Sequence, residues 1–198
     1  MLYHLLFPNT DTSPDIRISD NGSSNEMIWE SGVKINPEEY DLSNLEFICE
    51  TLPSGAMTDY AVSDMGCSVI SERLKKYFDK LGLKNIQYFP ATIIEKEGNT
   101  AINGYFASNF IGKIDCIDRD SSELRSRKNK DGEYKAIFSI DKLALKENLV
   151  NEEPLFRAAY FTRLIVINEA LTNQFKESDM TGIRLVAPER WDGINGEI

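Results

Sequence analysis

One stretch constrains the fold of this chain more than any other, residues 69–90, which read VISERLKKYFDKLGLKNIQYFP. Its apolar residues recur at helical spacing and form a single stripe, made of Ile70, Leu74, Tyr77, Phe78 and Leu81. Such a stripe is typical of an amphipathic helix that packs one face on a core. We therefore expect a helix over residues 71–81, placed on a sheet.

The ends of this helix are also marked in the sequence. Ser71 suits the N-cap, and Glu72 follows it near the positive end of the helix dipole. Gly82 stands where the helix must stop and turn. A strand is expected over residues 86–89, ending before Pro90, because proline cannot donate to a strand ladder.

A weaker copy of the stretch occupies residues 166–188, VINEALTNQFKESDMTGIRLVAP. The coinciding pairs are Val69/Val166, Ile70/Ile167, Glu72/Glu169, Leu74/Leu171, Phe78/Phe175 and Ile86/Ile183. Asn168 and Glu169 take the capping places, and Gly182 takes the place of the helix stop. Duplication and chance explain these identities equally well, because any two helix–strand units share this pattern.

These signals predict an α+β fold. We expect a largely antiparallel or mixed sheet, with two amphipathic helices, residues 71–81 and 168–177, packed on it as a candidate duplicated helix–strand unit. A hairpin is expected from residues 124–128 and 134–140, with the basic tip Arg125, Arg127, Lys128 and Lys130. A long strand is expected over residues 105–117, and a long connection over residues 51–67.

Length and termini set broad limits. A chain of 198 residues can bury one core, or form a small lobe and a larger one. The start, MLYHLLFP, lacks the basic region of a secretory signal, and no window reaches the roughly 20 apolar residues of a membrane span. Cys49, Cys67 and Cys116 are far apart in the sequence, which indicates reduced thiols. We expect a cytoplasmic protein without membrane contact.

The net charge of −10 is concentrated at one end. Residues 1–64 carry twelve acidic residues against Arg17 and Lys34, whereas residues 65–198 carry twenty of each sign. This asymmetry argues against nucleic acid and favours a basic protein partner, although solubility alone explains it equally well. The candidate contact residues are Glu38, Glu39, Asp41, Glu46 and Glu50, with Trp29 or Tyr40 as an aromatic anchor. Trp29 itself is expected at the end of a strand.

Few residues of the sequence suit a catalytic role. The single histidine, His4, lies in an apolar run and is expected in an edge strand, and no nucleophile motif or imidazole metal site can be built around it. The densest acidic cluster is Asp115, Asp118, Asp120 and Glu123.

Structural roles suit this cluster and its surroundings best. Asp118 and Ser121 can close a turn, and Asp115, expected within a strand, can pair with Arg157 or Arg163. We expect Asn109, Asp115, Asp118 and Arg157 to be architectural, with no catalysis, cofactor or metal. An enzyme or small-molecule binder that uses these acids with Arg157 remains as an alternative.

Four segments together resemble a known family: ISERLKKYFDKLGLKNIQYFP, YFASNFIGKIDCIDRDSS, LFRAAYFTRLIVINEALTNQF and MTGIRLVAP. The recurring features are the SERL helix start at Ser71 and Glu72, Pro90, Asn109, Asp115 to Asp118, Phe156 and Arg157, Glu169 and Gly182. They resemble the bacterial immunity proteins numbered eleven among the immunity families of polymorphic toxin systems, first catalogued as a domain of unknown function.

The likeness spans residues 59–188. It divides the chain into an acidic region of short strands and loops (1–58) without a family feature, a family-like α+β domain (59–188) and a tail (189–198). The resemblance implies a cytosolic protein without catalysis that neutralises a partner toxin by binding it. A structural or adaptor domain that binds protein without a toxin partner is the other alternative.

Overall fold

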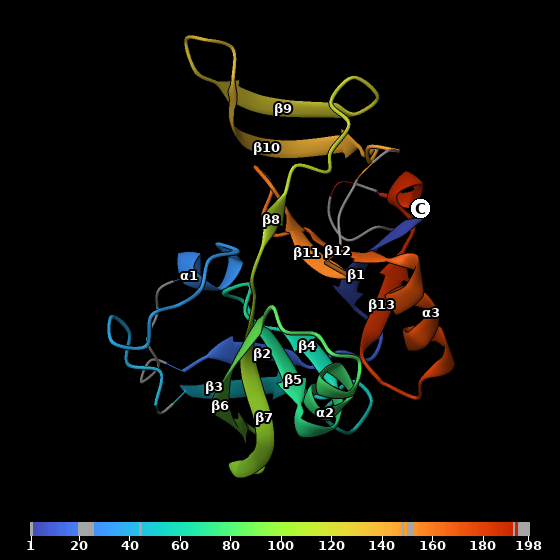
Figure 1. Cartoon of the computed structure of the whole chain (residues 1–198). Coiled ribbons are helices and arrows are strands. Elements are labelled where there is room, and N and C mark those ends of the chain that lie inside the picture. Colours follow the sequence, from blue (N-terminus) through green and yellow to red (C-terminus); the bar gives the residue numbers. More distant parts are fainter. Residues whose placement is uncertain are drawn as a thin grey trace. The chain divides into compact units, whose positions relative to one another are not determined.

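The computed structural model describes residues 2–19, 26–43, 45–147, 149, 153–191 and 193 (Figure 1). The chain forms two compact units. Unit 1 contains Met1–Phe7, Gly112–Ser178 and Leu185–Ile198, and unit 2 contains Pro8–Ile111 and Asp179–Arg184. The predicted division at residues 58 and 188 was based on charge and family likeness rather than packing, and it stays a prediction.

Unit 2 is built on a mixed six-stranded sheet with the order β2-β3-β6-β7-β5-β4. The strands are β2 (Asp15–Ile18), β3 (Leu45–Thr51), β4 (Tyr60–Val62), β5 (Ser68–Ser71), β6 (Ile86–Glu95) and β7 (Thr100–Phe110). β3 runs parallel to β6, and the other neighbouring strands are antiparallel. The prediction of a mixed sheet is therefore confirmed.

Two helices pack on opposite faces of this sheet. On one face, α2 (Glu72–Lys80) buries Leu74 and Phe78, and the Phe78 ring meets Phe110 of β7 edge-on, with 6.3 Å between ring centroids. On the other face, Trp29 of α1 (Glu26–Glu30) meets Phe89 of β6 in the same manner at 5.8 Å. Each face of the sheet therefore has its own aromatic contact with a helix.

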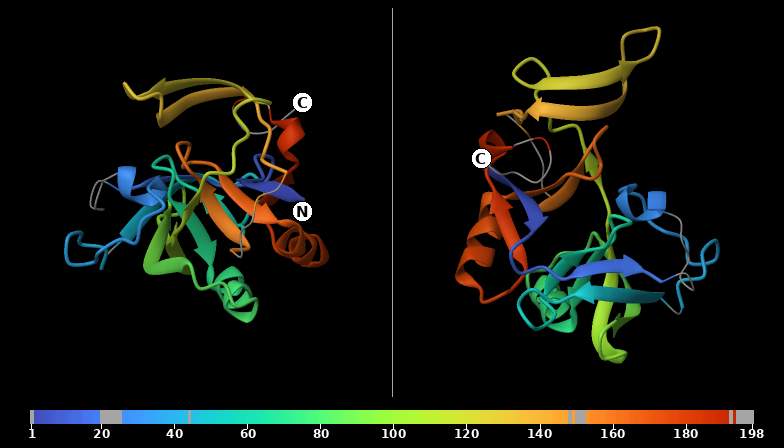
Figure 2. Two further views of the ribbon diagram at one scale, coloured as in Figure 1. Left: turned by 45° about the horizontal axis from the view of Figure 1, so that its top comes forward. Right: turned by 180° about the vertical axis from the view of Figure 1, so that it is seen from behind.

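Unit 1 has a five-stranded sheet with the order β13-β1-β12-β11-β8 and a separate hairpin, β9 with β10. Its elements are β1 (Tyr3–Pro8), β8 (Lys113–Ile114), β9 (Glu123–Lys128), β10 (Tyr134–Lys142), β11 (Leu155–Ala158), β12 (Ile165–Asn168), α3 (Glu169–Glu177), β13 (Ile183–Val186) and the 3-10 turn η1 (Pro188–Arg190). Pro8 of β1 and the first two residues of β13 are counted with unit 2. α3 packs beside β12 (Figure 2). Trp191 belongs to the core and its Nε1 donates to the carbonyl of Ile140 at 2.6 Å.

Both predicted helices are capped and buried as expected. Leu74 is 0% exposed and Leu171 is 4% exposed. The Ser71 side chain accepts from the Leu74 amide, and that of Asn168 accepts from the Leu171 amide. The α+β fold with two packed amphipathic helices is confirmed.

The internal repeat extends to strand order. In unit 2, β5 and β6 lie on either side of β7 and are joined by α2. In unit 1, β12 and β13 lie on either side of β1 and are joined by α3. Each unit therefore contains a strand–helix–strand connection that passes over one intervening strand.

Two strand predictions need correction. β6 continues through Pro90 to Glu95, because β3 begins only opposite Ala91 and Pro90 has a strand neighbour on one side alone. The strand predicted over residues 105–117 is two strands, β7 and β8, interrupted at Gly112, whose φ of 105° breaks the extended conformation.

Three local predictions also differ from the structure. His4 does not lie in an edge strand, because β1 has β12 and β13 as neighbours. The connection over residues 51–67 contains β4, which pairs with β5. Trp29 was expected at a strand end and instead lies in α1.

Candidate partner-binding surface

The predicted acidic contact residues occupy the segment between α1 and β3, and β3 itself. Glu38, Glu39 and Asp41 are exposed. Asn36 organises this segment, since its Nδ2 donates to Glu39 Oε1 at 3.1 Å and its Oδ1 accepts from the Glu38 amide at 3.2 Å. The hydroxyl and amide of Ser43 both donate to Asp41, and these bonds lower the pKa of that carboxyl. These bonds favour the ionised form of Asp41 and orient its side chain.

The two aromatic anchor candidates differ in burial. Trp29 is 0% exposed and belongs to the core of unit 2, so its side chain is not on the surface in this structure. Tyr40 is half-buried and packs against the same core, so part of its ring remains accessible. Only Tyr40 keeps the exposure that an anchor needs.

β3 carries Glu46 and Glu50, which point to the same side of the sheet because side chains four residues apart on a strand share a face. Glu50 is ion-paired with Lys96 and with Arg17, whose Nε lies 2.5 Å from Oε1. The bonds from Lys96 and then Arg17 lower the pKa of Glu50. Within the described residues, the Glu46 carboxylate has no hydrogen bond or ion pair. Glu46 is therefore the carboxylate of this strand that is open to a partner.

A hollow of about 400 Å³ adjoins Glu46 where β3, β6 and β7 run side by side. Its lining includes Ser43, Glu46, Pro90, Gly104, Tyr105 and Phe106. Of the predicted residues, Glu46 lines this hollow, and Asp41 is bonded to Ser43, which also lines it. Sequence reasoning did not find the hollow, because it depends on strand register.

Asn109 and Asp118 make the contacts of architectural residues. The Asn109 side chain is buried, and its Nδ2 donates to the Val33 carbonyl at 2.8 Å and to Gln87 Oε1 at 3.0 Å. Asp118 accepts from the amides of Asp120 and Ser121 and from the Ser121 hydroxyl. These contacts agree with the turn expected from Asp118 and Ser121.

Asp115 and Arg157 have different partners from those predicted. Asp115 follows β8 and pairs with Arg119 at 2.6 Å and with Lys146 at 3.3 Å, not with Arg157 or Arg163. Arg157 is 1% exposed, and its Nη1 donates to the carbonyl of Thr162 at 2.6 Å. Its guanidinium therefore stabilises the turn between β11 and β12. The architectural role of these residues is supported and stays a prediction.

The remaining motif residues lie at the two helix starts, at the end of α2 and just before β13. Glu72 is exposed and pairs with Lys76 one turn later at 3.0 Å, and Glu169 occupies the first turn of α3. Gly182 has a φ of +78°, and Gly82 has a φ of +74°. Gly82 follows the C-cap Leu81 and ends α2 as expected. The helix stop predicted at Gly182 is wrong, because α3 already ends at Glu177 with Ser178 as its C-cap, and Gly182 lies just before β13.

The most densely bonded carboxylate, Asp59, was not found by sequence reasoning. It is 7% exposed and accepts from the Ser71 hydroxyl, the Arg73 guanidinium, and the amide and hydroxyl of Thr181. Burial alone would raise its pKa, but these bonds outweigh burial and lower the pKa to about 2. Its partners are up to 122 positions away, so no local pattern marks it.

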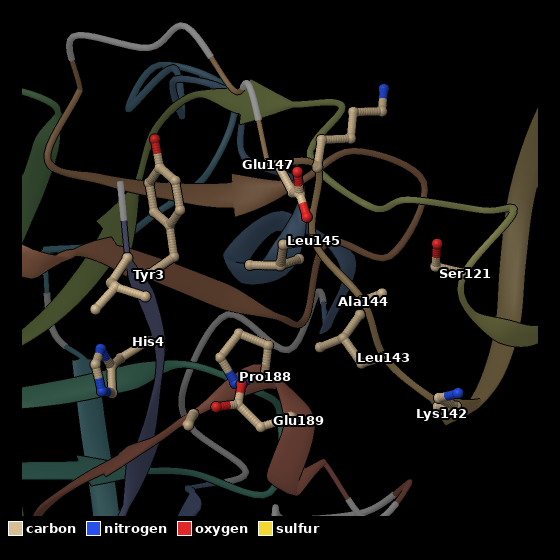
Figure 3. Close-up of a pocket in the computed structure, with 13 residues that line it drawn as sticks. Tyr3, His4, Ser121, Lys142, Leu143, Ala144, Leu145, Glu147, Pro188 and Glu189 are labelled. Atoms are coloured by element: carbon tan, nitrogen blue, oxygen red, sulfur yellow. The ribbon is translucent and has the colours of Figure 1, made fainter.

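Unit 1 contains a separate cavity of about 550 Å³ (Figure 3). His4, Leu143, Leu145, Glu147, Pro188 and Glu189 are among its lining residues. Nδ1 of His4 is buried without a hydrogen-bond partner in the described part of the chain. Burial, followed by the charge of Lys176, lowers the pKa of His4. The cavity carries charges of both signs and none of the predicted contact residues.

The residues that the structure describes contain neither a metal-binding cluster nor a membrane-spanning helix. Among them, no group of three or more His, Cys, Asp or Glu side chains could hold a metal ion. In the same residues, no helix is long and apolar enough to cross a membrane.

Comparison with known proteins extends the likeness found in the sequence. A model of the immunity protein family Imm11 matches residues 10–188, which include the N-terminal third where we saw no family feature. That expectation was therefore wrong for most of residues 1–58. No curated protein matches the chain. Because the match covers most of its length, the chain belongs to the immunity protein family Imm11.

Proposed function

We propose that this protein is a cytoplasmic immunity protein that neutralises a cognate toxin of a polymorphic toxin system by direct binding, without catalysis. Membership of the immunity protein family supports a toxin-neutralising role. We further propose that the toxin is basic and docks on the acidic face of unit 2, made of Glu38, Glu39, Asp41 and Glu46, with Tyr40 beside them.

The distribution of charge carries this proposal. Unit 2 holds seventeen acidic and nine basic residues, a net charge of −8, whereas unit 1 holds fifteen and thirteen, a net charge of −2. An acidic field accelerates capture of a basic partner and repels acidic competitors. Glu38, Glu39 and Asp41 are exposed, so they can contribute to this field without first breaking buried contacts.

Co-expression with a toxin domain encoded beside this chain tests the function. We expect the two proteins to co-purify and the cells to survive toxin expression. A toxin that remains active and separate in the presence of folded protein would contradict the proposal, and would favour an adaptor or structural role instead.

A triple reversal, Glu38→Lys, Glu39→Lys and Asp41→Lys, tests the surface. We expect slower association and a weaker dependence of the association rate on salt, measured at two salt concentrations. The matched control is Glu147→Lys, Glu177→Lys and Glu189→Lys, which changes the net charge equally on exposed positions of unit 1 outside the β9–β10 hairpin. If both variants behave alike, the basic hairpin tip at Arg125, Arg127, Lys128 and Lys130 is the next surface to test.

A further inference from the structure

The hollow beside Glu46 is shaped by a bulge in β7. Ala91 lies opposite Tyr105 and Ile93 lies opposite Ile102, so two steps along β6 match three steps along β7. Asn103 and Gly104 therefore share Thr92 as their partner. Gly104 has a φ of +83°, as expected for the glycine of such a bulge. Bulges of this kind redirect side chains and are common beside binding sites.

The space over the bulge is open. A Cβ atom built on Gly104 would meet no atom within 4 Å. Pro90 is exposed and Phe106 is half-buried, so the hollow has apolar walls that solvent reaches. A partner side chain can therefore enter without displacing a side chain of this protein.

The polar groups of the hollow favour a cation. Glu46 lines it with a carboxylate that has no hydrogen bond or ion pair within the described residues, and the lining residue Ser43 donates its hydroxyl to Asp41. The carboxylate of Glu46 would attract a positive charge, and the apolar walls suit the methylene groups of a long stem.

The protein itself shows that aromatic rings on this part of the sheet accept a cation. Nζ of Lys75, on α2, lies 4.9 Å from the ring centroid of Tyr88 and 5.9 Å from that of Phe106. Phe106 also lines the hollow. Because the Lys75 ammonium is already beside this ring and would repel a second charge there, Phe106 serves the hollow as an apolar wall for the stem, and the charged head is left to Glu46.

We propose that the hollow is the socket for one lysine or arginine side chain of the toxin. This inference rests on the proposed function and specifies one side-chain contact within the proposed interface. The bulge opens the socket, Pro90 and Phe106 contact the stem, and Glu46 pairs with the charged head. A desolvated charge pair at an interface acts mainly on the dissociation rate.

The test compares Glu46→Gln with Glu97→Gln, using the toxin domain that co-purifies with the protein. Both substitutions remove one negative charge from unit 2, but Glu97 is exposed on the β6–β7 turn, outside the hollow. We expect Glu46→Gln to raise the dissociation rate at least tenfold, and Glu97→Gln to change it less than twofold. Thermal unfolding of both variants checks that each is folded.

Substitutions in the toxin identify the occupant. Each lysine and arginine of the toxin is replaced in turn by methionine, and dissociation is measured from wild type and from Glu46→Gln. One such substitution should abolish the difference in dissociation rate between wild type and Glu46→Gln, because it removes the partner of Glu46.

The outcomes separate the two proposals. If the toxin binds wild type, and Glu46→Gln dissociates no faster than Glu97→Gln, the socket is wrong and the proposed function stands. If no basic residue of the toxin couples to Glu46, a lysine or arginine occupant is excluded. If the toxin does not bind at all, the proposed function and the socket both fail.

Discussion

The connection β5–α2–β6 of unit 2 and the connection β12–α3–β13 of unit 1 have the same local design in different surroundings. Each helix is capped by the last residue of the preceding strand, and a left-handed glycine lies between each helix and the strand that follows it. The surroundings of the two glycines differ. A Cβ on Gly82 would meet nothing within 4 Å, whereas one on Gly182 would overlap the Tyr60 carbonyl oxygen and lie 2.5 Å from Thr58 Oγ1. The same sequence pattern therefore predicts a left-handed glycine at both places, but it does not predict how much each glycine contributes to stability.

The largest difference is expected between Gly82→Ala and Gly182→Ala. Both add left-handed strain of about 1–2 kcal/mol. Gly182→Ala also forces the Tyr60 backbone aside, so we expect a total loss of about 4 kcal/mol or more in the free energy of unfolding. Urea unfolding measures both values. Equal losses would show that the close packing around Gly182 has no energetic consequence.

Truncation of the helix core should affect both connections similarly. Leu74→Ala and Leu171→Ala each empty a buried site, at 0% and 4% exposure, and should cost roughly 2–5 kcal/mol. The exposed residues Lys76 and Lys176 provide controls, because their alanine variants should change the free energy of unfolding by less than about 0.5 kcal/mol. A loss below about 1 kcal/mol at either leucine would mean that its helix does not depend on the stripe.

Acid should weaken unit 2 through Asp59. Its folded-state pKa of about 2 lies below the ordinary unfolded value near 3.9. The stabilisation is therefore fully present above about pH 4 and is lost as the pH falls toward 2, a change of about 2 kcal/mol. Asp59→Asn should remove this acid-dependent part, which unfolding measured between pH 5 and pH 2 would reveal. A variant with the wild-type pH profile would assign the effect to other carboxylates.

The smallest effects are expected at the two caps. Asn168→Ala removes one bond to the Leu171 amide and should cost about 1 kcal/mol. Ser71→Ala removes the equivalent bond and also the hydroxyl that donates to Asp59 at 2.6 Å, so about 2 kcal/mol is expected. Chemical denaturation of both variants tests this order, with Asn168→Asp as a control that keeps the cap. The reverse order would show that the bond to Asp59 contributes little.

The sequence pattern predicted those elements whose formation depends on residues close together in the chain. Helical spacing and caps identified α2 and α3, and turn residues identified the hairpin of β9 and β10. The prediction at Pro90 was wrong because the effect of a proline depends on which neighbouring strand is present beside it. The same limitation applies to Asp115, whose partners Arg119 and Lys146 depend on how the segments around it pack.

The candidate surface could be predicted only in outline. Charge counting marked residues 38–50, and the structure leaves Glu38, Glu39 and Asp41 exposed. Charge counting could not show that Glu50 is already paired with Arg17 and Lys96, or that Trp29 is buried. The hollow depends on a register shift between β6 and β7, which becomes visible only when the two strands are paired.

The segment Asp179–Arg184 belongs to unit 2, although it follows α3 in the chain. It supplies the Thr181 amide and hydroxyl to Asp59 and the Asp179 carboxylate to Arg73. During synthesis, residues 8–111 therefore emerge from the ribosome long before the segment that completes their packing. Until Thr181 leaves the exit tunnel, Asp59 is without two of its donors, and a chaperone or protease would encounter unit 2 in an unfinished state.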